Sequence, residues 1–380
     1  FPKPDQSPVI NNTQTSFPRV IAICSSDKWA GTEKWVLRAC ENLHRRNRQV
    51  MLVTRHPDVF IRRLETDLPI IQFPMRNEAD IGSVIRMTGL FRNNADVIIP
   101  TRVRDYWLAG MAARLARVPV LLRLGVVRRL RDDYMMDKLR YGKFPSGILV
   151  NAIAIRETLS QTPWINPKNI HVIYNGVDAP GFTEISEKQK IRKELEIPDD
   201  HIFIVGAGRL AIEKRWGWIA DALPRIQQSG LQATAIVFGE GSERPIIEHR
   251  IREHGLETEF LLPGHRSDID KIFGAADIVA LPSSNEGVSN VMLEAMGRGT
   301  MVVATDSGGA REKFTDGENI LLAGNNDFDG FADRLLRAAS SADLRRTIGA
   351  NSFETVQNHF TWLKMIYTLE ELLIQIAGNK

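Results

Sequence analysis

Two glutamates eight residues apart, Glu286 and Glu294, are the side chains whose spacing most suggests chemistry. They lie in the segment SSNEGVSNVMLEAMGRG, residues 283–299, where the apolar spacing predicts a helix that starts near Gly287. Two helical turns then separate the carboxylates, so we expect both to face one cleft. A carboxylate can accept hydrogen bonds from two adjacent hydroxyls, which would hold a ribose or a hexose. The alternative is one acid at a helix start and one on its solvated face.

The start of this helix is also expected to contact the ligand through its backbone. The first N–H groups of a helix have no partner inside it, and they bind phosphates and similar anions. The residues that would present these groups are Gly287, Val288, Ser289 and Asn290.

A glycine-rich turn with two cations follows another apolar run. The sequence Gly206-Ala-Gly208-Arg-Leu-Ala211 formally matches a dinucleotide-binding turn, but no obvious acidic residue follows about 20 positions later. Instead, Arg209 and Lys214 come within one loop. Two cations suit a diphosphate that gains negative charge as it departs. One alternative is that both cations are ordinary surface charges. The other is a nicotinamide oxidoreductase, an interpretation that only the glycine pattern would support.

A third turn, residues 25–34, joins the first apolar run to a helix expected to reach about Arg46. Gly31 stands at the start of that helix, where a small residue lets a phosphate approach the backbone N–H groups. The alternative is an ordinary strand-to-helix turn with Asp27 or Thr32 as the helix cap.

The elements that must position these turns are short apolar runs alternating with amphipathic segments. Continuous Val, Ile and Leu runs are typical of parallel strands covered on both faces, so we expect an α/β fold with two doubly wound, Rossmann-like domains facing across a cleft. The predicted strands are residues 20–24, 50–54, 70–73, 97–100, 120–124, 148–150, 170–174, 202–205, 234–238, 260–262, 278–281, 301–304 and 320–322. The predicted division is a frayed tail at 1–17, domains at 18–180 and 181–358, and a helix at 359–380 that packs back across the junction.

Composition excludes several classes of protein. The chain has 380 residues, 43% hydrophobic and 25% charged, which excludes a disordered chain, and its two cysteines exclude a disulfide scaffold. No apolar run reaches the roughly 18 residues of a membrane span. The sequence therefore predicts a cytoplasmic protein, and a place at the inner face of a membrane is a further expectation.

Charge is distributed unevenly along the chain. Up to Asp178 there are 27 Lys and Arg against 16 Asp and Glu, and the remainder has 22 against 30. A basic half predicts contact with something anionic, such as acidic lipid or acceptor phosphates. Arginines on solvated helix faces are the alternative, and nucleic acid is not expected because no aromatic residues interleave with the cations.

These motifs together resemble those of the retaining glycosyltransferase family 4, whose members have the GT-B fold. The resemblance rests on five elements and spans most of the chain from about Arg19. They are Gly31-Thr-Glu33, Asn175-Gly-Val-Asp178, Gly208-Arg-Leu with Lys214, Glu286-x7-Glu294, and Gly308-Gly-Ala-Arg-Glu312.

The resemblance implies a role for each matching residue. Arg209 and Lys214 would bind the donor diphosphate, Glu286 the donor sugar and Glu294 the ribose. Gly31 would approach the diphosphate from the opposite domain, and the turn with His265 and Arg266 would line the base. The implied reaction moves a hexose from a UDP-type or GDP-type sugar to a glycan or lipid-linked acceptor with retention, and without a metal or other cofactor.

One position departs from the family pattern. The family often has a histidine near the end of the fifth strand, but this chain has Arg123 there, so Arg123 or Asp105 is expected to orient the sugar instead. Two other functions remain open for the same architecture. One is a sugar-nucleotide 2-epimerase, and the other is a catalytically silent binding subunit.

Overall fold

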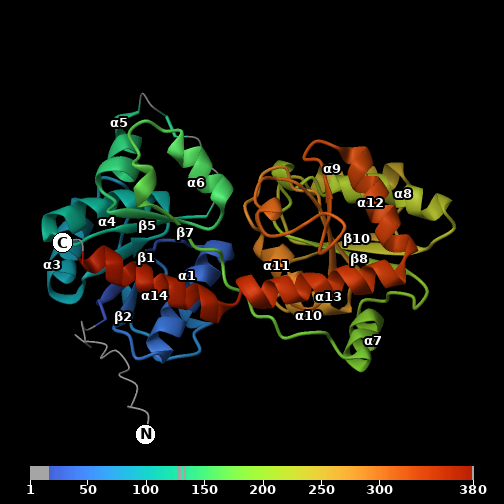
Figure 1. Ribbon diagram of the computed structural model, residues 1–380, viewed down its shortest axis with the longest axis horizontal. Helices are drawn as coiled ribbons and strands as arrows, with labels where there is room; N and C mark the ends of the chain where they lie inside the picture. Colours follow the sequence, from blue (N-terminus) through green and yellow to red (C-terminus); the bar gives the residue numbers. More distant parts are fainter. Residues whose placement is uncertain (1–16, 126–129, 132–133, 379–380) are drawn as a thin grey trace, which may run out of the picture.

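The computed structural model describes residues 17–125, 130–131 and 134–378, so the tail predicted at 1–17 lies outside this part except for Phe17. Two lobes, each built on a parallel sheet, lie side by side along the long axis (Figure 1). We call the part with β1–β7 the first lobe and the part with β8–β13 the second lobe. The arrangement confirms the predicted α/β class.

The first lobe contains a sheet in the order β3-β2-β1-β4 and a second set in the order β5-β6-β7. A parallel bridge between Ile98 and Val120 places β5 next to β4, so the two sets continue one another. The strands are β1 Val20–Cys24, β2 Val50–Thr54, β3 Ile70–Gln72, β4 Val97–Pro100, β5 Leu121–Leu124, β6 Gly147–Val150 and β7 Ile170–Val172. The helices are α1 Gly31–Arg45, α2 Asp58–Ile61, α3 Ile81–Asn94, α4 Val103–Ala116, α5 Met135–Asp137, η1 Lys138–Lys143, α6 Ile153–Ser160 and η2 Pro167–Asn169.

The second lobe has six parallel strands in the order β10-β9-β8-β11-β12-β13. They are β8 Ile202–Ala207, β9 Ala233–Phe238, β10 Phe260–Gly264, β11 Ile278–Leu281, β12 Met301–Thr305 and β13 Leu321–Ala323. Its helices are α7 Ile185–Glu194, η3 Ile212–Lys214, α8 Gly217–Gln228, α9 Arg244–Glu253, α10 Ile269–Ala275, α11 Asn290–Met296, η4 Ala310–Glu312, α12 Phe328–Ser340 and α13 Ala342–His359. The strand order reverses direction between β8 and β11, and ligands of open α/β sheets bind beyond the carboxyl ends of strands at such a point.

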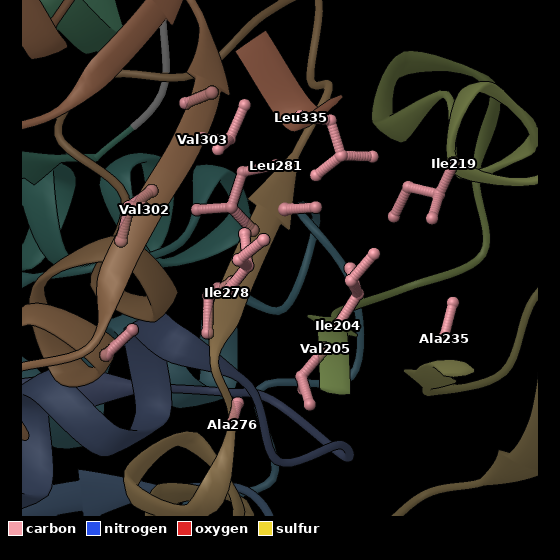
Figure 2. Close-up of a cluster of buried hydrophobic side chains, with 14 of the residues drawn as sticks. Ile204, Val205, Ile219, Ala235, Ala276, Ile278, Leu281, Val302, Val303 and Leu335 are labelled. Atoms are coloured by element: carbon pink, nitrogen blue, oxygen red, sulfur yellow. The ribbon is translucent and has the colours of Figure 1, made fainter. Parts of the chain in front are cut away.

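The core of the second lobe explains why its strands are uninterrupted apolar runs. Ile204 on β8 pairs with Ile278 on β11, and Val303 on the neighbouring β12 is buried in the same cluster (Figure 2). Ile219 from α8 and Leu335 from α12 cover this cluster. Strands buried on both faces hold the loops at their carboxyl ends rigidly, which is what a binding site needs.

The last helix, α14 Trp362–Gly378, crosses back from the second lobe to the first (Figure 1). Leu373 and Ile376 belong to the same buried cluster as Val20 of β1 and Leu43 of α1. Glu370 also receives hydrogen bonds from Arg46, at 3.1 Å from Nε, and from Arg48, at 2.7 Å from Nε. The predicted return of the C-terminal helix is therefore confirmed, while the exact domain boundaries stay a prediction.

Leu373→Ala is expected to lower the free energy of unfolding by about 3 kcal/mol, because it leaves a cavity in the first lobe's core. Ile374→Ala is the matched control, since Leu373 is 0% exposed and its neighbour is 47% exposed. Urea denaturation of the two variants measures the difference. Equal losses of stability would contradict the placement of α14 against the first lobe.

Candidate functional site

The ammonium of Lys214 and the carboxylate of Glu286 form an ion pair at the carboxyl edge of the second lobe's sheet. Lys214 ends η3, which follows β8, and Glu286 lies in the loop after β11, so the pair joins loops on either side of the strand-order reversal. Ser284 donates its N–H to the carbonyl of Glu213 at 2.7 Å, which ties the two loops together. The structure thus brings together two of the residues predicted to be catalytic.

Glycines shape the loop that carries Lys214. Gly208 has a φ of +149°, which other residues rarely adopt. A Cβ at Gly239 would lie 1.9 Å from the carbonyl oxygen of Gly208, so these two loops touch backbone to backbone. Only glycine fits there, and the close packing fixes the path of the chain toward Lys214.

Arg209 is not part of the Lys214–Glu286 pair. Its side chain is 72% exposed, and its guanidinium lies 2.5 Å from the carboxylate of Glu213. Its carbonyl accepts a hydrogen bond from the indole of Trp216 at 3.0 Å, which anchors the backbone but leaves the side chain on the surface. A role on a diphosphate would require Arg209 to exchange Glu213 for the ligand.

Glu294 meets the other lobe. The ammonium of Lys34 on α1 lies 2.6 Å from the Glu294 carboxylate on α11. Next to it, the amide of Asn175 donates to the Asn290 side chain at 2.8 Å. A Cβ at Gly31 would be 3.4 Å from that same Asn290 amide, so the start of α1 faces the start of α11 across the lobes.

The helix predicted from near Gly287 begins instead at Asn290, and this part of the prediction was wrong. Glu286 forms a parallel bridge with Gly308, and a Cβ at Gly309 would lie 2.4 Å from the carbonyl carbon of Gly287. The bridge keeps the chain extended, and Ser289 is still extended at φ −70° and ψ 132°. The backbone of residues 287–289 is therefore a loop rather than a helical turn.

Glu312 makes a second connection between the lobes. Its carboxylate accepts hydrogen bonds from the N–H groups of Ile153 and Ala154, each at 2.8 Å, at the start of α6. It also accepts from the hydroxyl of Tyr174 at 2.9 Å. Burial, together with Glu312, raises the pKa of that hydroxyl above its usual range. The sequence showed Glu312 only as the end of a glycine-rich motif and gave no sign of this contact between lobes.

Arg123 lies behind the interlobe contact, where the family pattern led us to expect a sugar-orienting group. It is buried, its guanidinium lies 4.5 Å from the ring centre of Trp35, and it donates to the side-chain oxygen of Asn175 at 3.1 Å. Burial lowers its pKa to about 10, so it stays cationic at neutral pH. Arg123 therefore orients Asn175, which in turn holds Asn290.

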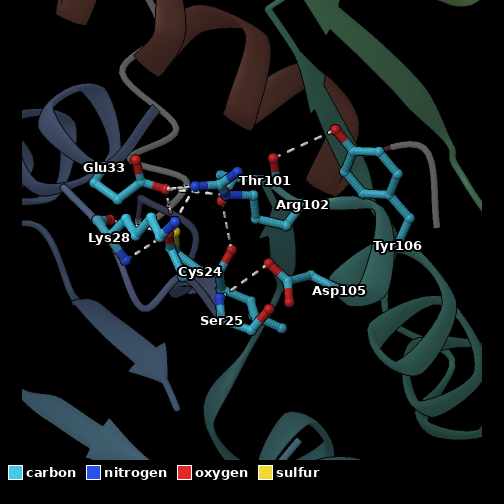
Figure 3. A network of polar contacts seen from close by, with 10 residues as sticks. Cys24, Ser25, Lys28, Glu33, Thr101, Arg102, Asp105 and Tyr106 are labelled. Carbon is cyan, nitrogen blue, oxygen red and sulfur yellow. Dashed lines mark hydrogen bonds and ion pairs between the residues drawn. The ribbon is translucent and has the colours of Figure 1, made fainter. Parts of the chain in front are cut away.

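Asp105, the other predicted acceptor-side residue, is buried at the start of α4 (Figure 3). One carboxylate oxygen accepts from the N–H of Ser25 at 3.2 Å, and the other has no partner among the described residues. Burial raises its pKa to about 7. Asp105 thus supports the loop after β1.

Asp105→Asn is expected to stabilise the protein at pH 8 more than at pH 5. A carboxyl with a raised pKa in the folded state binds its proton more tightly there, so its contribution to stability falls between about pH 4 and pH 7 and is then constant. At pH 8 the Asp105 carboxyl lowers the free energy of unfolding by on the order of a few kcal/mol, because a tenfold change in its acid dissociation constant corresponds to about 1.4 kcal/mol. Thermal unfolding at both pH values measures it, and equal shifts would contradict the buried position.

His265 and Arg266, predicted to line the base, lie in the turn after β10. His265 is exposed, and Arg266 contacts Asp268 at 2.8 Å and Glu194 at 2.5 Å. Those two carboxylates raise the pKa of Arg266. The carbonyl of Gly264 accepts the N–H of Gly239 at 2.8 Å, and Gly239 in turn packs against Gly208, at the start of the Lys214 loop.

Two searches of the described residues bear on other kinds of site. Residues 17–125, 130–131 and 134–378 contain no cluster of three His, Cys, Asp or Glu side chains that could hold a metal ion. Within the same ranges, every helix is too short or too polar to cross a membrane.

Known proteins match both lobes. A family model described as Glycosyltransferase Family 4 matches residues 29–179, and one described as Glycosyl transferases group 1 matches residues 187–355. A D-inositol 3-phosphate glycosyltransferase of Xylanimonas cellulosilytica is 31% identical over 284 residues, which are 68% of this chain and 67% of that protein. The lipopolysaccharide core biosynthesis glycosyltransferase LpsE of Rhizobium meliloti is 26% identical over 224 residues, or 59% of this chain. The match spans 63% of LpsE, a little under two thirds of its length.

Among solved structures, Anabaena HepE in complex with UDP and glucose superposes with a TM-score of 0.82 at 22% identity. The superposition covers 94% of this chain and 100% of HepE. The fold is thus shared over nearly the whole length, and the family models cover both lobes. The chain belongs to glycosyltransferase family 4 and has the GT-B fold.

Proposed function

We propose that the protein is a retaining glycosyltransferase that moves a hexose from a UDP-type or GDP-type sugar to a glycan or lipid-linked acceptor of the lipopolysaccharide or polysaccharide kind. The observation that carries this proposal is the Lys214–Glu286 pair at the edge of the second lobe's sheet. The pair supports the proposal because Lys214 could bind a phosphate while Glu286 beside it accepts hydrogen bonds from sugar hydroxyls, as the reaction needs. The lipopolysaccharide core biosynthesis of LpsE and the UDP and glucose bound in the HepE structure support these substrate classes.

In this proposal the second lobe holds the donor. Lys214 leaves Glu286 and binds the β-phosphate. Arg209 leaves Glu213 and brings a second cation to the same diphosphate. Together they neutralise the charge that develops on the departing diphosphate. Glu286 accepts hydrogen bonds from the hexose hydroxyls, and Glu294 accepts them from the ribose after Lys34 moves aside.

The first lobe then presents the acceptor hydroxyl. Gly31 leaves room for the diphosphate at the start of α1, whose N-cap Ala30 has no side-chain cap to occupy the free N–H groups. The acceptor attacks on the face from which the diphosphate departs, and the anomeric configuration is kept. The contact of the basic first lobe with an anionic membrane stays a prediction.

A thermal-shift panel of UDP, GDP, ADP and their sugars tests the donor part. One base should stabilise the protein by about 2.7 kcal/mol at a hundred times its dissociation constant. Glu294→Gln should weaken that effect, while Glu253→Gln on the exposed part of α9 should not. Proton NMR of the product would show the donor's anomeric configuration. No stabilisation by any nucleotide, or conversion of the sugar nucleotide without an acceptor, would contradict the proposal.

A further inference from the structure

A hollow of about 420 Å³ opens in the first lobe at the carboxyl ends of three adjacent strands, β2, β1 and β4. No residue that lines it has been given a part in donor binding above. It is lined by residues that follow each of these strands: Ser25, Ser26, Asp27 and Lys28 after β1, Arg55 and His56 after β2, and Arg102 and Arg104 at the start of α4, which follows β4.

Positive charge dominates this hollow. Four cations and a histidine line it, against the single carboxylate of Asp27. Among the described residues, the side chains of Lys28 and Arg55 contact no carboxylate, and Arg104 reaches only the carbonyl of Met75, at 3.5 Å. Cations that face one small volume repel one another, and a bound anion would remove that cost.

A network of hydrogen bonds fixes Arg102 and the start of the loop after β1, both of which line the hollow (Figure 3). Arg102 donates from Nε to the fully buried carboxylate of Glu33 at 2.9 Å and from Nη2 to the hydroxyl of Ser26 at 2.6 Å. That hydroxyl also accepts the N–H of Lys28 at 3.3 Å, and Asp105 holds the N–H of Ser25. The Arg102 guanidinium and the backbone of residues 25–28 are therefore preorganised, which lowers the entropy lost when a ligand binds.

We propose that this hollow binds a phosphoryl group of the acceptor substrate. The inference rests on the proposed glycosyltransferase function and adds the chemical class of the acceptor. A phosphoryl group brings up to two negative charges and three acceptor oxygens, and guanidinium groups such as those of Arg55 and Arg104 match it in pairs of hydrogen bonds. A single carboxylate would leave most of these donors without a partner.

The position of the hollow separates it from the donor phosphates. All of its lining residues belong to the first lobe, whereas Lys214 and Arg209 belong to the second. The loop that begins at Ser25 ends at α1, where Lys34 contacts Glu294 at 2.6 Å. An acceptor whose phosphoryl group lies in the hollow can thus extend along this loop toward the contact between the lobes, where the donor is proposed to bind.

The test measures binding of inorganic phosphate by calorimetry at constant ionic strength. The variants are Arg55→Gln/Arg104→Gln, Lys214→Ala to weaken the donor site, and Arg62→Gln/Arg86→Gln, which removes two exposed charges from the same lobe. We expect the Arg55/Arg104 variant to lose at least tenfold in phosphate affinity. The Lys214 and Arg62/Arg86 variants should keep a phosphate site of wild-type affinity. Wild-type affinity in the Arg55/Arg104 variant, or loss only in the Lys214 variant, would overturn the inference.

Two further readouts separate this inference from the proposed function and from a membrane site. UDP binding should be unchanged in the Arg55→Gln/Arg104→Gln variant, while the acceptor KM rises at least tenfold. If phosphate binds as expected but no nucleotide binds to any variant, the proposed function fails and the anion site stands. Vesicles with phosphatidylglycerol that bind through Arg55 and Arg104, with no binding of inorganic phosphate, would identify a lipid surface and overturn the acceptor assignment.

Discussion

Lys214→Ala is expected to lower kcat for transfer by about 10² to 10³, with a smaller effect on the dissociation constant of the donor. The departing diphosphate gains charge in the transition state, so a cation aimed at it stabilises that state more than the bound substrate. Loss of one such group typically costs roughly 3–4 kcal/mol. Steady-state kinetics and nucleotide titration on the same protein separate the two effects.

The control for this variant is Lys190→Ala, which removes an exposed lysine of α7 in the same lobe. It should transfer at the wild-type rate. Lys214→Arg tests geometry, because a planar guanidinium keeps the charge but presents its donors differently from the ammonium that lies against Glu286. More than a tenth of wild-type kcat in Lys214→Ala would refute the role that we assign to the ammonium.

The layout of strands could be predicted from the sequence because burial on both faces leaves a direct trace in it. Each predicted apolar run corresponds to a strand, with ends that shift by a few residues. The eighth run, for example, extends to Ala207 rather than Val205. Residues 206–207 were assigned to the glycine turn, but backbone pairing with Val237 and Phe238 continues through them.

Contacts between the lobes left no such trace. Lys34 and Glu294 are 260 positions apart, and Glu312 contacts N–H groups near position 153. Lys34 looks like an ordinary surface charge in its own segment, and Glu294 and Glu312 were assigned to motifs of the second lobe rather than to a contact between the lobes. Their pairing depends on how the two lobes face each other, which hydrophobic periodicity within one segment does not encode.

The direction of the side chains was the other feature that the sequence could not predict. The spacing of Arg209 and Lys214 put both cations in one loop, but the loop turns at Arg215, which has a φ of +52°. Lys214 therefore faces Glu286, and Arg209 pairs with Glu213 four positions along. The motif placed both cations in one loop, while the structure brings only Lys214 against Glu286.

Glu286→Ala is expected to reduce kcat/KM by about 10². The carboxylate would lose its hydrogen bonds to the donor sugar, and hydrogen bonds to a charged group contribute about 1.5–3 kcal/mol each. The loss also leaves the partly buried ammonium of Lys214 without its partner in the free enzyme. Steady-state kinetics with Glu253→Ala on α9 as the exposed control measures the effect.

The double variant Lys214→Ala/Glu286→Ala makes this prediction sharper. Two residues in direct contact do not act independently, so their effects should not add. We expect the double variant to fall only a little below Lys214→Ala, because each single change already disrupts the same pair. Full additivity, near 10⁴ to 10⁵, would mean that the two side chains act at separate places on the donor, and the ion pair would then be incidental to transfer.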